Sequence, residues 1–200
     1  GVVLQDGQLL NFDNVASNGD VRFTYNELLK DEPRLEGARK SINKKSLSMS
    51  LFVIYFGTKV RYPNMAHHNV IFGGRYKEHL ADIFKRGTLA DDFSLYLHAP
   101  TVSDASLAPP GHEAFYVLSP VPHLGAAPID WTVEGPKYAD KIMSYLEARY
   151  LPNLRANVVT QRIFTPNDFQ TELLATHGSA FSTEPILRQS AYFRTHNRDK

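Results

Sequence analysis

The chain has 200 residues and a formal net charge of +1, from 22 lysines and arginines against 21 aspartates and glutamates. This near-neutral balance argues against a nucleic-acid-binding domain, which usually has a basic stripe. The chain contains no cysteine, which excludes a disulfide scaffold and thiolate metal sites and fits a reducing compartment. Its longest apolar run, residues 51–56, is far shorter than the roughly 18 residues of a membrane span.

The first predicted element is a hairpin. Residues 1–4 and 9–12 have the composition of two strands, and Asp6 and Gly7 supply a tight turn between them. Because the sequence starts inside a hairpin and without an initiator methionine, we expect it to be part of a longer protein. Further on, Thr24 and Glu27 form a capping-box pattern, which predicts a helix over 25–30.

The rest of the chain alternates irregularly between strand and helix patterns. Residues 31–46 are polar and weakly periodic, which predicts a surface connector or a poor helix. The spacing predicts further helices over 76–85 (with Tyr76, Leu80, Ile83 and Phe84 on its apolar side), from Gly135–Pro136 to about 150, after Thr165 (with Phe169, Leu173 and Leu174 inward) and near 187–193. Strands are predicted over 48–56, 69–72, 93–98, 115–118 and 158–164. This order indicates an α+β (mixed α/β) fold, a mixed β-sheet with helices packed on it.

The eight histidines raise the question of a metal site. His67 and His68 are adjacent, and in a strand adjacent side chains point to opposite faces, so we do not expect them to share an ion. His98, Asp104, His112 and His123 lie near prolines and could cluster in loops, but no H-x-x-x-H or H-E-x-x-H spacing supports a site. We therefore predict no metal.

Other recognised catalytic motifs are absent from the sequence. It has no G-x-S-x-G nucleophile elbow, no G-x-G-x-x-G and no P-loop. What remains is a large number of Phe and Tyr residues at strand ends and near prolines. These residues fit a plain aromatic core, or an apolar tunnel for a long hydrophobic ligand.

Several separate segments resemble bacterial-type phytoene desaturases (phytoene dehydrogenases), the FAD-dependent carotenoid desaturases of the amine-oxidase-like flavoprotein class. The segments are SLFVIYFG (50–57), DFSLYLHAPTVSDASLAPPG (92–111), FYVLSPVPHLG (115–125), DWTVEGPK (130–137), RIFTPNDF (162–169), HGSAFSTEP (177–185) and QSAYFRTHNRDK (189–200). The stretch SNGDVRFTYNELL (17–29) is similar to the family segment in which the chain crosses back toward the flavin domain. The resemblance spans nearly all of the chain.

This resemblance implies the substrate-binding region of a longer flavoenzyme, over residues 1–200, with 13–46 and 191–200 crossing toward an FAD domain. The cofactor implied is FAD, whose main binding motifs would lie outside this chain. The reaction implied is the dehydrogenation of phytoene toward lycopene. The resemblance also implies a cytoplasmic enzyme attached peripherally to the membrane, with a long apolar polyene as its partner and no nucleic acid. The run Arg39, Lys40, Lys44 and Lys45 is the one candidate contact with lipid, although a solvated loop is the favoured interpretation.

By the same resemblance, Ser17, Asn18, Gly19 and Asp20 are the candidate flavin-contacting residues. Because a hydrocarbon has no charge to bind, affinity must come from apolar burial at about 0.8 kcal/mol per CH₂ group. We therefore predict substrate contacts from Leu95, Leu97, Phe164, Phe169 and Phe181, and we assign no catalytic acid or base. Two alternatives stay open: a non-catalytic domain that binds carotenoid or lipid, and a sibling desaturase or saturase acting on another polyene. We expect the chain to be inactive by itself.

Overall fold

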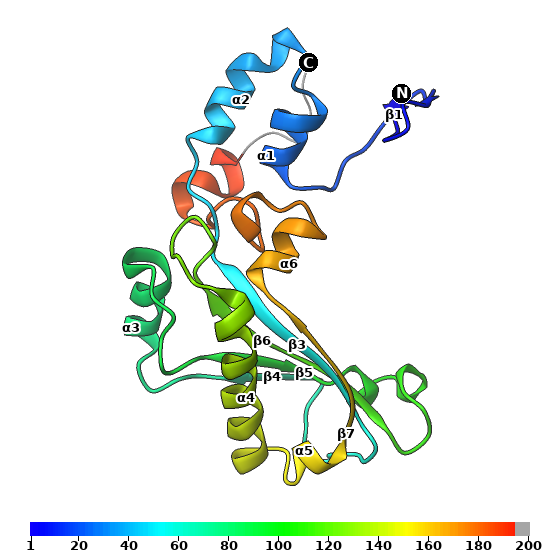
Figure 1. Ribbon diagram of the computed structural model, residues 1–200, viewed down its shortest axis with the longest axis vertical. Helices are drawn as coiled ribbons and strands as arrows, with labels where there is room; N and C mark the ends of the chain where they lie inside the picture. The colour runs from blue at the N-terminus through cyan, green and yellow to red at the C-terminus, as the bar shows by residue number, and fades with distance from the viewer. Residues whose placement is uncertain (195–200) are drawn as a thin grey trace.

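A computed structural model describes residues 1–194 of the chain (Figure 1). Its centre is a five-stranded sheet in the order β4, β5, β6, β3, β7, in which every neighbouring pair is antiparallel. The strands are β3 (Ser50–Thr58), β4 (His68–Ile71), β5 (Leu95–His98), β6 (Glu113–Val121) and β7 (Val158–Phe164). The predicted α+β class is confirmed, and so is the strand predicted over 158–164.

The longest helix, α4 (Trp131–Arg149), packs across one face of this sheet (Figure 1). The spacing of apolar residues predicts a buried stripe of Tyr138, Ile142, Tyr145 and Leu146. Three of these are buried, and Tyr145 is partly buried. The predicted start at Gly135–Pro136 was wrong, because Asp130 caps the helix by accepting a hydrogen bond from the Thr132 amide. Pro136 therefore lies inside the helix, where its missing N–H removes one helical hydrogen bond.

The strand β6 passes through the Ser119-Pro120 pair at which the sequence predicted its end. Its pairing with β5 stops at Leu118, so the missing N–H of Pro120 removes no hydrogen bond to β5. On the other side, Pro120 stays opposite Leu51 of β3. The strand therefore reaches Val121.

The core lies between the sheet and α4. Alternate residues of each strand point toward the helix, since successive side chains in a strand face opposite sides. The fully buried side chains in this layer include Phe52, Ile54, Leu97, Val117, Ile142 and Leu146. The interior between sheet and helix is thus filled by side chains.

The upper part of the molecule contains α1 (Val21–Phe23), α2 (Glu36–Asn43) and the hairpin β1 (Val2–Val3) with β2 (Leu9–Leu10) (Figure 1). The hairpin was predicted. The helix predicted over 25–30 begins earlier, because Asp20 and not Thr24 caps it, and it continues as a π-helical turn to Leu28. The helix α2 lies in the predicted connector, anchored by the buried Ile42.

The shorter helices are α3 (Tyr76–Ala81), α5 (Leu154–Asn157) and α6 (Pro166–Thr171). Ile83 is buried as predicted, but Tyr76 and Phe84 are exposed. Tyr76 is the first residue of α3, whereas Phe84 lies in a π-helical turn from Asp82 to Arg86 that changes the direction of its side chain. Thr165 and Asp168 form the predicted cap of α6. Leu173 and Leu174 are exposed, contrary to prediction, because α6 ends at Thr171. Near 187–193 the chain forms two short 3₁₀ turns.

Within the described residues, no helix is both long and apolar enough to cross a bilayer.

Candidate functional site

The face of the sheet opposite α4 has two parallel rows of side chains that the strand register places side by side. In the first row Tyr55 lies opposite Tyr116, Tyr116 opposite His98, and His98 opposite His68. In the second row Val53 lies opposite Leu118, Leu118 opposite Tyr96, and Tyr96 opposite Val70. Strand β7 extends the rows with Arg162 beside Tyr55 and Phe164 beside Val53. We call these ten residues the aromatic face.

Ring contacts join the aromatic face into a continuous surface. The ring centroids of Tyr116 lie 5.9 Å from Tyr55, 5.8 Å from Tyr96 and 4.6 Å from His98. Val70 exposes 60% of its surface and Tyr55 exposes 45%, so side chains on β4 and β3 remain accessible. The β7 side is covered, because Phe164, Leu51 and Val53 pack with Phe169 and Ala180.

The Tyr116 phenol at the centre of this face stays neutral at physiological pH. Burial, together with the neighbouring Tyr96 hydroxyl, raises the pKa of Tyr116 to about 12. The rings of this face offer a long apolar ligand extensive contact area, and its one arginine, Arg162 on the edge strand β7, is paired with Glu172.

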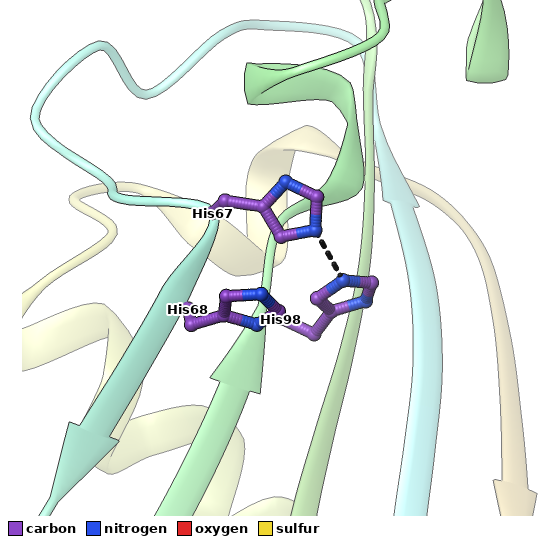
Figure 2. A group of neighbouring side chains, drawn as sticks. All are labelled: His67, His68 and His98. Atoms are coloured by element: carbon purple, nitrogen blue, oxygen red, sulfur yellow. Dashed lines mark hydrogen bonds between the residues drawn. The ribbon is translucent and has the colours of Figure 1, made fainter.

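At one end of the first row three histidines form a cluster (Figure 2). The Nε2 atoms of His67 and His98 lie 2.7 Å apart, and one ligand atom from each of the three rings lies within 4.8 Å of the others. His68 is the direct cross-strand partner of His98. Burial lowers the pKa of His98, and so do His67 and His68 beside it.

The side chains of His67 and His68 lie next to each other, so the prediction that they point to opposite faces was wrong. His67 precedes β4, which begins at His68, so the alternation of a strand does not apply to it. The amide of Ala99 donates to the carbonyl of His67 and holds that residue beside His98. The other candidates lie apart from the cluster: Asp104 accepts from Ser106, and His112 donates to the carbonyl of Pro110. His123 stacks on His177.

The five predicted substrate residues lie in different places. Phe164 belongs to the aromatic face, and the Phe169 ring meets its edge at 5.0 Å. Phe181 is 57% exposed and follows Ala180, which packs on the same small cluster. Leu95 and Leu97 point the other way, into the filled core beneath α4. The assignment of these five residues to substrate stays a prediction.

The predicted flavin-contacting segment forms a turn before α1. Ser17 and Gly19 are exposed, and the Gly19 amide donates to the Ser17 hydroxyl. Oδ1 of Asp20 accepts from the Phe23 amide and from the Thr176 hydroxyl. Oδ2 of Asp20 is buried and has no hydrogen-bond partner among the described residues.

Three of the four residues in the basic run have polar partners. Arg39 donates to the carbonyls of Tyr25, Leu29 and Lys30, and Lys40 pairs with Glu36. Nζ of Lys45 donates to the carbonyl of Phe193. These bonds tie the run to neighbouring segments.

The aromatic face was mostly missed from the sequence. The strict alternation over 93–98 indicated that Tyr96 and His98 lie on the side opposite Leu95 and Leu97, and this signal pointed to them. Nothing local indicated that Tyr55, Tyr116 and Val70 join them, because that depends on the pairing of distant strands.

Comparison with known proteins shows extensive similarity, although no family model matches the chain. The chain is 59% identical over its full length to a protein of Paracoccus sp. named phytoene desaturase (lycopene-forming), and it covers 40% of that protein. A protein of the same name from Pseudescherichia vulneris is 57% identical over 99% of the chain, again with 40% covered. A phytoene desaturase (neurosporene-forming) of Rhodobacter capsulatus is 45% identical over 98% of the chain, which covers 38% of it.

These similarities confirm the resemblance to bacterial-type phytoene desaturases. The chain spans about 40% of the length of the curated relatives that it matches.

Proposed function

We propose that the chain is the substrate-binding region of a flavin-dependent desaturase that dehydrogenates phytoene toward lycopene. The single observation that carries the proposal is the aromatic face, a two-row surface rich in aromatic rings on the side of the sheet away from the core. Three relatives at 55–59% identity are named lycopene-forming phytoene desaturases, which supports this substrate and product.

The chemistry of the aromatic face suits a hydrocarbon. A long polyene gains about 0.8 kcal/mol for each CH₂ group that leaves water, and aromatic rings supply large, rigid contact areas. The Tyr116 phenol, with its pKa raised to about 12, adds no charge that would attract water. On this proposal the rings of Tyr55, Tyr96 and Tyr116 orient the polyene and exclude water from it.

The turn at residues 17–20 fits the edge of a polar cofactor. Ser17 and Asn18 are exposed, and Oδ2 of Asp20 is a buried acceptor without a partner in the described part of the chain. A flavin has hydroxyl and ring N–H donors that suit such an acceptor. The bound flavin would accept the hydride from the substrate. Ser17, Asn18 and Asp20 would help to hold it, with Gly19 in the turn between them.

The same proposal covers the domain organisation. Residues 13–46 and 191–200 would cross toward a flavin-binding domain, and residues 195–200 of the second crossing lie outside the described residues. The upper part of the molecule exposes Phe12, Leu28 and Leu187, which suits a surface that another domain covers. Because its substrate dissolves in lipid, we propose that the enzyme works in the cytoplasm at the membrane surface.

A chimaera tests this function directly. The whole 200-residue chain replaces the matching 40% of the Paracoccus relative, and the product is incubated with FAD and phytoene-loaded liposomes. We expect the chimaera to retain FAD on gel filtration and to convert phytoene into products absorbing in the visible range. Tyr116→Ser should lower turnover about tenfold, the equivalent of one lost aromatic contact, while FAD is retained.

The matched control is Tyr76→Ser, since Tyr76 is exposed on α3, away from the aromatic face. A chimaera that keeps FAD and binds polyene without converting it would favour the non-catalytic carrier. Equal turnover in the Tyr116 and Tyr76 variants would remove the aromatic face from substrate binding.

A further inference from the structure

We propose that His67, His68 and His98 form a binding site for a divalent transition-metal ion of the zinc class. Each of the three imidazoles has one ligand atom within 4.8 Å of the others. The cluster lies where β4 begins and β5 ends (Figure 2). The site shares His68 and His98 with one end of the aromatic face, but the proposal does not depend on the proposed substrate function.

The backbone places all three rings before any ion binds. His68 and His98 are direct partners in the β4–β5 ladder. The amide of Ala99, the residue after His98, donates a hydrogen bond to the carbonyl of His67 and holds it in place. The ring centroids of His67 lie 4.3 Å from His68 and 4.6 Å from His98. Because ordered backbone fixes the ligands, little conformational entropy remains to be lost on binding.

Two of the rings are also oriented as metal ligands usually are. Nδ1 of His67 lies 2.6 Å from the Ser103 hydroxyl, and Nδ1 of His68 lies 2.6 Å from the Tyr96 hydroxyl. A histidine ligand commonly donates its second ring N–H to such a partner, which fixes the tautomer and leaves Nε2 free to bind. With Nδ1 as the donor in each of these bonds, His67 and His68 would both offer Nε2 to the ion.

The short contact between His67 and His98 is compatible with a shared ion. Their Nε2 atoms are now 2.7 Å apart, bridged by one proton. Two zinc–nitrogen bonds of ordinary length at a tetrahedral angle separate the nitrogens by about 3.3 Å, so a small ring rotation admits the ion. The ion then replaces the bridging proton, and that proton moves to Nδ1 of His98, which has no other partner among the described residues.

The donor set selects the class of ion. Imidazole ligands suit zinc, copper and nickel, whereas magnesium and calcium prefer carboxylate and carbonyl oxygens, and the cluster contains no carboxylate. His68 is exposed, so the fourth position is open to water.

Calorimetric titration of the chain with ZnCl₂ tests the site, with Co²⁺ as a spectroscopic probe and MgCl₂ as the negative control. We expect one Zn²⁺ per chain and a tetrahedral Co²⁺ absorption band. His68→Ala and His98→Ala should each weaken zinc binding at least tenfold, and Tyr96→Phe should weaken it about tenfold through the lost orienting bond. His112→Ala is the matched control, because His112 lies outside the cluster, and it should bind zinc as the unchanged chain does.

Because His68 is exposed, His68→Ala should fold and can test the site even if His98→Ala does not fold. Circular dichroism checks the folding of each variant. Failure of the folded chain to bind zinc would overturn the proposal and leave the cluster as a hydrogen-bond network. Zinc binding that is unchanged in His68→Ala would also overturn it.

Discussion

The hydroxyl oxygens of Ser119 and Tyr138 lie 2.8 Å apart in a buried hydrogen bond that ties β6 to α4. Tyr138→Phe leaves the Ser119 hydroxyl buried without this partner, so we expect a loss of about 1–3 kcal/mol in the free energy of unfolding, measured by urea denaturation. Combining it with Ser119→Ala removes both polar groups, and the double variant should lose less than the sum of the two single variants. Simple additivity would show that the two hydroxyls do not interact.

Stability should fall in strong alkali through the same tyrosine. Burial raises the pKa of Tyr138 to about 12, whereas an unfolded tyrosine titrates near 10. The folded state therefore holds the proton more tightly, so the stabilisation is fully present below pH 10 and is lost as pH rises from about 10 to about 12. Urea midpoints at intervals across this range should fall less steeply for Tyr138→Phe than for the unchanged chain. If the urea midpoints of both proteins fall equally steeply with pH, Tyr138 is not the residue whose raised pKa causes the loss of stability.

Among the acidic residues in the described part of the chain, replacing Glu113 should lower the stability most. Its carboxylate, only 1% exposed, accepts a 2.7 Å hydrogen bond from the Tyr62 amide and lies 3.5 Å from Nε of Arg61. Glu113→Ala leaves that amide without its acceptor, and we expect it to cost about 2–3 kcal/mol in thermal or urea unfolding.

Two milder variants separate the contributions to this site. Glu113→Gln keeps an acceptor for the Tyr62 amide and should cost less than Glu113→Ala. Arg61→Ala should cost least, since the arginine is half exposed and solvent screens the pair. A reversed order, with Arg61→Ala the most destabilising, would show that the ion pair outweighs the amide bond.

Gly178 should not tolerate a side chain. Its φ is +64°, and a Cβ there would lie 2.2 Å from the Pro166 carbonyl oxygen. Gly111 has a φ of +78° with open space around it, so it provides a control with the same backbone preference and no clash. We expect Gly111→Ala to cost about 1 kcal/mol and Gly178→Ala clearly more, by urea unfolding. Equal costs would mean that the loop after α6 moves to accommodate the methyl group.

The sequence was informative wherever a single segment contains its own signal. The alternation at Leu95 and Leu97, the buried stripe of α4 and the Thr165 cap all follow from local periodicity or hydrogen bonding. Errors arose where neighbours decide the outcome. Pro120 stays in a strand because β5 has already ended beside it, and Phe84 is exposed because a π-helical turn shifts its direction.

The candidate sites depend even more on contacts between distant segments than the individual helices and strands do. The histidine cluster needs the β4–β5 register, and the aromatic face needs β3, β6, β5 and β4 to lie in that order, which is not the order of the chain. Tyr55 on β3 and Val70 on β4 share one face of the sheet only because β6 and β5 lie between those strands. No short stretch of the sequence indicates this arrangement.

The alternation of β6 has a consequence for how relatives of this chain can diverge. Val117 is sealed beneath α4, whereas Tyr116 and Leu118 on either side of it belong to the opposite surface. Exchanging those two neighbours changes the shape of that surface while the packed layer is left intact. If the proposed function holds, substitutions that change ligand preference and substitutions that change folding fall on adjacent residues of this one strand.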